Sequence, residues 1–68
     1  MTLDAQLLAA HAQDDKQALV RLYTQAADAT ADVDAACFYL THAYVFALEI
    51  HDPARDALHG RLAAHGRV

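Results

Sequence analysis

The sequence predicts an all-α fold, a small bundle of three to four antiparallel helices that forms a single domain over residues 1–68. Three observations support this class. Alanine, the strongest helix former, occupies 17 of the 68 positions. Glycine occurs only at positions 60 and 66 and proline only at 53, so helix breakers are confined to the C-terminal part. Apolar residues recur at helical spacing, and a chain this short forms at most one domain.

The first helix is expected over about residues 3–13, with Thr2 as its N-cap. Leu3, Leu7 and Ala10 fall on one face, at positions i, i+4 and i+7. Leu8 lies beside that face and is expected to broaden it.

A second helix is expected to run to about Ala29, with Asp14 as its N-cap and Gln17 at the capping-box position three residues later. It is conventionally amphipathic. The residues that form its apolar face are Ala18, Leu19, Leu22, Tyr23, Ala26 and Ala27.

The segment 30–34 contains neither glycine nor proline, so a continuous helix is conceivable. A break is preferred, because Asp32 or Asp34 can cap a third helix over about residues 35–51. Apolar side chains cover roughly 200° of this third helix. It is therefore expected to be the buried, central element. Cys37 is expected to be sheltered there, on the same side as Tyr44 and Leu48.

Pro53 suits the first turn of a fourth helix, with Asp52 as N-cap, an end near His65 and Gly66 as its C-terminal stop. Its inner side is expected to be formed by Ala54, Ala57, Leu58, Arg61 and Leu62.

Composition argues against several functional classes. The net charge is −4 and the arginines are isolated along the chain. This argues against nucleic acid and against an anionic membrane surface as partners. The apolar run "CFYLTHAYVFAL" is too short to span a membrane. With no secretory leader pattern and a single cysteine, Cys37, a cytoplasmic location without disulfides is expected.

The sequence also predicts no catalytic, cofactor-binding or metal-binding residues, so we expect a protein that is not an enzyme. No two histidines have the i, i+4 spacing of a zinc-binding helix. Cys37 and His42 diverge by about 140° on one helix, which is unfavourable for a nucleophile and its base. Glu49, His51 and Asp52 are interpreted as a solvated helix end rather than an acid–base site.

A repeat occurs at an offset of 39 residues, between "AHAQDDKQAL" (10–19) and "EIHDPARDAL" (49–58). Together with "ALVRLY" (18–23) and "ALEIHDPA" (47–54), it resembles tetratricopeptide and Sel1-like helical-hairpin repeats, over about one and a half repeats within residues 15–66. The resemblance implies a fold that binds other proteins and has no catalytic residues.

The third helix carries the candidate interface. Phe38 and Val45 lie outside its main apolar arc, about 20° apart, and such exposed apolar residues on a small protein indicate an interface. The predicted interface residues are Phe38, Thr41, His42, Val45 and Glu49. A second copy is the expected partner, in a homodimer. Enclosure of the helix within one chain remains the alternative.

The expected function is therefore a non-catalytic protein-interaction module, a small helical adaptor or regulatory subunit that self-associates. The alternative is a small enzyme or ligand-binding protein. It would use His42, Glu49 and the tyrosines in a site between subunits.

Overall fold

The computed structural model describes residues 2–68, and within them the chain forms four helices and no strand. They are α1 (Leu3–Ala12), α2 (Lys16–Ala29), α3 (Val33–Glu49) and α4 (Ala54–Ala64). The predicted all-α fold and the break before α3 are therefore confirmed. Compared with the expected ranges, α3 begins two residues earlier and ends two residues earlier, and α1 and α4 each end one residue earlier.

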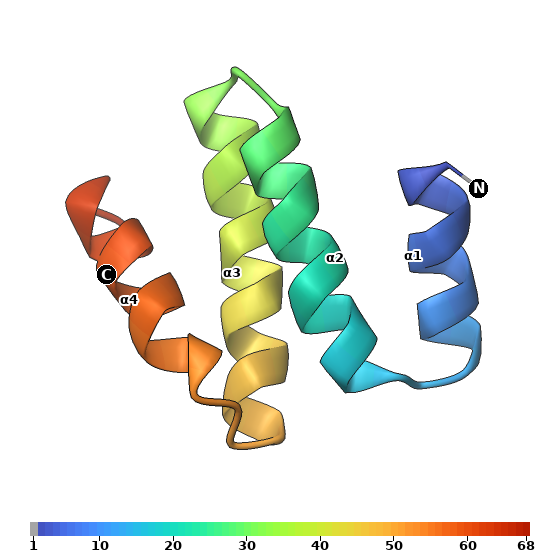
Figure 1. The fold of residues 1–68 in the computed structure, drawn as a ribbon. Helices are drawn as coiled ribbons and strands as arrows, with labels where there is room; N and C mark the ends of the chain where they lie inside the picture. Colours follow the sequence, from blue (N-terminus) through green and yellow to red (C-terminus); the bar gives the residue numbers. More distant parts are fainter. Residues whose placement is uncertain (1) are drawn as a thin grey trace.

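Each helix packs against its neighbours in sequence. The antiparallel pair α2 and α3 forms the centre, with α1 beside α2 and α4 beside α3 (Figure 1). Close backbone contacts join only these successive helices. The molecule is correspondingly flat, with principal extents of 32 × 28 × 12 Å. The third helix is central, as expected, but the alternative of its enclosure within one chain is not found, because no described helix covers the side of α3 that carries Phe38 and Val45.

The core consists of leucine, valine, cysteine and alanine side chains in two clusters. One cluster joins α2, α3 and α4 through Val20, Ala27, Cys37, Leu40, Ala43, Ala47, Leu58 and Leu62. The other joins α1 to α2 through Ala10, Leu19 and Leu22, with Leu3, Leu7 and Phe46 packed against them. Ala43 and Ala47 are completely buried, and their small side chains let neighbouring helices approach closely. Leu8 and Ala57, expected on inner faces, are exposed.

Side-chain oxygens cap the helix starts. Thr2 Oγ1 accepts a hydrogen bond from the amide of Ala5, and Asp32 Oδ1 accepts one from Asp34. Asp52 Oδ1 accepts from Ala54 at 2.9 Å, as the sequence predicts. The predicted cap of α2 was wrong by one residue, because Asp15, rather than Asp14, accepts from Ala18.

Asp14 instead ends α1. Its φ of 52° is left-handed, and the amides of Asp14 and Asp15 bond back to the carbonyls of His11 and Ala10. This pair of bonds defines a Schellman motif. The same motif ends α3, where His51 has a φ of 54°. It also ends α4, where Gly66 has a φ of 70°, as expected for its predicted stop.

Candidate interaction surface on the third helix

The uncovered side of α3 carries a row of exposed side chains, which we call the α3 stripe: Phe38, Thr41, Val45 and Leu48. Phe38 is 59% exposed, Val45 46% and Leu48 43%. Residues at this spacing lie within a narrow sector of a helix. All five predicted interface residues lie on this side, since Glu49 is also exposed and His42 partly so.

The opposite side of α3 explains why the stripe is uncovered. Cys37, Leu40, Ala43 and Ala47 are buried against α2 and α4. Both neighbouring helices contact this side, and α1 packs on α2, so no helix remains to cover the stripe.

Leu48 is the stripe residue that sequence reasoning missed, because it was expected to be buried beside Cys37. The two residues are about 20° apart on a helical wheel, at the edge of the apolar arc. Cys37 is small and lies in a groove that Arg67 also lines, and it is 2% exposed. The larger Leu48 is near the end of α3, where the chain turns towards α4, and its side chain remains partly exposed. Its i+7 spacing from Thr41 was the available signal.

The polar groups of Thr41, within the stripe, and of His42, beside it, bond to the backbone of α3 itself. Thr41 Oγ1 donates to the carbonyl oxygen of Cys37 at 2.8 Å. His42 Nδ1 lies 2.9 Å from the carbonyl oxygen of Phe38, and because a carbonyl only accepts, this nitrogen carries the proton. The stripe therefore presents mainly carbon to solvent.

An aromatic cluster borders the stripe on the α2 side. The ring of His42 lies 4.4 Å from that of Phe38 and 5.0 Å from that of Tyr23, centroid to centroid. The hydroxyl of Tyr23 shares a hydrogen bond of 2.8 Å with His11 Nε2 on α1. Phe46 packs against both His11 and Tyr23. These contacts connect Phe38 and His42 to side chains of α1, α2 and α3.

An ion pair lies at each end of the stripe. At the N-terminal end of α3, Arg67 contacts Asp34 at 2.6 Å, and at the C-terminal end Lys16 contacts Glu49 at 3.2 Å. The hydrogen bond to Glu49 and the attraction of its charge raise the pKa of Lys16. The hydrogen bond to Asp34 is the main reason for the raised pKa of Arg67. Both cations are thus charged at neutral pH, each beside an anion.

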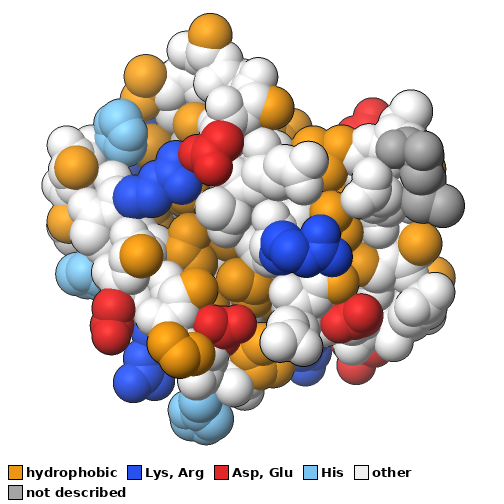
Figure 2. All heavy atoms as spheres, in the orientation of Figure 1, with side chains coloured by type: hydrophobic (Ala, Val, Ile, Leu, Met, Phe, Trp, Pro, Cys, Tyr) orange, Lys and Arg blue, Asp and Glu red, His pale blue; other side chains and the backbone are white. Residues whose placement is uncertain are grey.

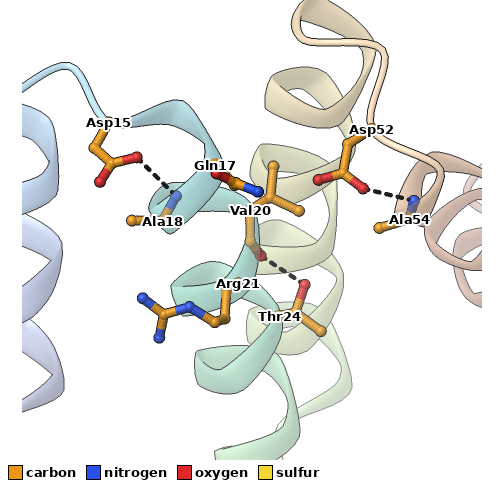
Figure 3. Close-up of a pocket in the computed structure, with 8 residues that line it drawn as sticks. All are labelled: Asp15, Gln17, Ala18, Val20, Arg21, Thr24, Asp52 and Ala54. Carbon is orange, nitrogen blue, oxygen red and sulfur yellow. Dashed lines mark hydrogen bonds between the residues drawn. The ribbon is translucent and has the colours of Figure 1, made fainter.

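The opposite face offers a groove of about 530 Å³ between α2 and the start of α4. Figure 3 shows that Asp15 and Asp52, on its rim, each point to a backbone amide. Thr24 Oγ1 donates to the carbonyl of Val20. The two aspartates bond to amides at helix starts and Thr24 bonds within α2, so these three groups do not converge on a common point in the groove.

On the face seen in Figure 2, charged side chains of both signs are interspersed with apolar ones, and some basic groups lie directly beside acidic ones. Across residues 2–68, no cluster of three or more His, Cys, Asp or Glu side chains is arranged to hold a metal ion. No helix in the same range combines the length and apolar character required to cross a bilayer.

The structure brings His42 of the alternative site together with Tyr23, whereas Glu49 is engaged elsewhere. Glu49 pairs with Lys16, whereas His42 stacks on Tyr23 and bonds to its own helix. Cys37, the only thiol in the sequence, is buried in the core. The residues that could support acid–base or nucleophilic chemistry are therefore engaged separately.

Comparison with protein-family models finds no match for this chain. Comparisons with curated proteins and with solved structures find no significant match either. A functional assignment therefore rests on the geometry of the chain itself.

Proposed function

We propose that this chain is a non-catalytic protein-interaction module, a small helical adaptor or regulatory subunit, that self-associates through the α3 stripe. The observation that carries the proposal is the contiguous exposure of Phe38, Val45 and Leu48 on one helix with no covering element. Exposed apolar groups gathered in this way mark interaction sites on small proteins.

Energetics supports the same conclusion. Burying a large apolar side chain contributes about 1.5–3 kcal/mol. Phe38 and Val45 are about half exposed in one chain, so their burial from two chains supplies roughly half of this per side chain, about 3–6 kcal/mol in total. This remains a large fraction of the stability expected of a domain of this size. Domains this small commonly depend on oligomerisation, a metal or disulfides, and the single cysteine excludes an intrachain disulfide.

The arrangement of polar groups favours binding over catalysis. A catalytic site needs a base or nucleophile that points into a shared space. Thr41 in the stripe and His42 beside it are bonded to the backbone of their own helix. The resemblance to helical-hairpin repeats supports protein binding as well.

Sedimentation at tens of micromolar tests the proposal. The wild-type chain should be dimeric, and the double variant Phe38→Gln, Val45→Gln should shift towards monomer because it removes the apolar centre of the contact. Circular dichroism of both proteins verifies that the helices remain folded.

Leu8→Gln is the matched control. Leu8 is 71% exposed on α1, outside the stripe, so its replacement should leave the dissociation constant unchanged. A monomeric wild type, or a double variant as dimeric as the wild type, would refute self-association through α3.

A further inference from the structure

The first helix is held to the rest of the molecule by few interactions. We propose that α1 is a lid: it opens as a unit by local unfolding while α2, α3 and α4 stay folded, and it then uncovers an apolar face of α2 that contains Leu19 and Leu22. This inference does not depend on self-association through the α3 stripe.

Burial separates α1 from a body that consists of α2, α3 and α4. Within residues 2–68, α1 contributes a single buried side chain, Ala10, whereas α2 contributes five and α3 four. The leucines of α1 that pack on α2, Leu3 and Leu7, are only partly buried. Because apolar stabilisation follows the area removed from water, α1 is held less firmly than α2 or α3.

Polar interactions follow the same division. Ion pairs connect α2 to α3, α2 to α4, and α3 to the C-terminal residues, and these pairs are Lys16–Glu49, Asp28–Arg61 and Asp34–Arg67. In the described part of the chain, no ion pair involves α1. A hydrogen bond of 2.8 Å between His11 and Tyr23 joins α1 to α2, and it lies at an exposed position, where water can replace it.

The start of α2 does not depend on α1. Asp15 Oδ1 accepts a hydrogen bond from the amide of Ala18, and the carbonyl oxygen of Asp15 accepts one from the amide of Leu19. Both bonds lie within α2 and its cap, so they persist when α1 leaves. A detached α1 unfolds, because its ten residues are fewer than the about 12–15 that an isolated helix needs in water.

Opening changes the surface that the chain presents. In the closed state Leu19 and Leu22 are buried, and Tyr23 and Phe46 are packed beside them. Without α1, these four side chains form one apolar face next to His42, which stacks on Tyr23. A partner can use this face only in the open state, and its binding would shift the population towards that state.

Amide hydrogen exchange of the full wild-type chain, followed by NMR over a series of urea concentrations, tests the lid. After correction for intrinsic rates, amides at positions 7–12 should exchange at least about tenfold faster than those at positions 40–47. Exchange from α1 should depend weakly on urea, because local opening exposes little surface, whereas exchange from α3 should depend on it strongly. Equal rates and equal urea dependence in the two helices would overturn the proposal.

A substitution in the body separates local opening from global unfolding. Leu58 on α4 is 3% exposed and belongs to the cluster that joins α2, α3 and α4. Leu58→Ala should speed exchange in α3 by about 30-fold or more and leave exchange in α1 unchanged, because the closed and the open state lose the same stability. A parallel acceleration in α1 would mean that α1 opens only when the whole chain unfolds. The urea series on the wild type decides the question if Leu58→Ala does not fold.

Two neighbouring leucines of α1 provide a matched pair. Leu7 packs on α2, whereas Leu8 is 71% exposed. Leu7→Ala should speed exchange in α1 about three- to tenfold, because part of the apolar contact with α2 is lost. Leu8→Ala removes the same side chain from the same helix and should leave exchange in α1 unchanged. Equal effects of the two substitutions would mean that exchange reports fraying of the helix itself, and would overturn the lid.

Discussion

At the scale of single residues, the two glycines occupy opposite conformational roles. Gly60 lies inside α4 with an ordinary φ, and a side chain added there would meet no atom within 4 Å. Gly66 is equally open but has a φ of 70° at the end of the Schellman motif. Space alone would therefore predict the same effect for both positions, whereas backbone conformation predicts opposite effects.

Gly60→Ala should stabilise the protein by about 0.5–1 kcal/mol, because glycine inside a helix is less favourable than alanine. Gly66→Ala should destabilise it by about 1 kcal/mol, because an L-residue is strained in the left-handed region. Urea unfolding of both variants beside the wild type measures the difference. Two changes of the same sign would contradict the Schellman end of α4.

At the scale of helices, two consecutive aspartates have different roles: one ends α1 and the other begins α2. Asp15 accepts the hydrogen bond from Ala18 that caps α2, whereas Asp14 occupies the left-handed position that ends α1. Asp15→Ala should cost about 0.5–2 kcal/mol of stability through the lost cap. Asp14→Asn is the matched control, because it removes a neighbouring charge and no capping bond, and asparagine tolerates the left-handed conformation of this position. The Asp15→Gly variant should recover most of the loss, since glycine is a tolerated N-cap.

The sequence was sufficient to predict which segments become helices, because alanine content, apolar spacing and caps act within a few residues. The assignment of Asp14 as a cap failed for a local reason. Either aspartate can cap, and the choice depends on which of them turns into the left-handed conformation. The outward direction of Phe38 and Val45 followed from helical angles. Leu48 lies at the edge of the apolar arc, where its i+7 spacing from Thr41 indicated the outer side but its actual exposure depends on how the chain leaves α3.

The contacts around the stripe could not be predicted from the periodicity of the sequence. Asp34 and Arg67 are 33 positions apart in sequence, and so are Lys16 and Glu49. Their contacts depend on α4 returning along α3 and on α2 running antiparallel to it. The hydrogen bond between His11 and Tyr23 likewise requires α1 to fold back on α2. Sequence patterns specify faces of helices, whereas these contacts depend on the packing of one helix against another.

At the scale of the whole molecule, flatness links folding to association. A body 12 Å thick has little interior, and its largest fully buried side chains are four leucines. If the dimer buries the α3 stripe, part of the apolar stabilisation is present only when two chains meet. Unfolding and dissociation then form one equilibrium, and stability depends on protein concentration.

The melting temperature of the wild-type chain should therefore rise by a few degrees for each tenfold increase in concentration. A tenfold change is equivalent to about 1.4 kcal/mol per dimer, which is about 0.7 kcal/mol per chain, and 1 kcal/mol per chain shifts the melting temperature of a domain of this size by about 4–8 °C. Circular dichroism at a few micromolar and at hundreds of micromolar measures the shift. The Phe38→Gln, Val45→Gln variant should melt at a lower temperature that no longer depends on concentration, whereas Leu8→Gln should behave as the wild type does. A concentration-independent wild-type melting temperature would mean that the folded monomer is stable without the α3 contact.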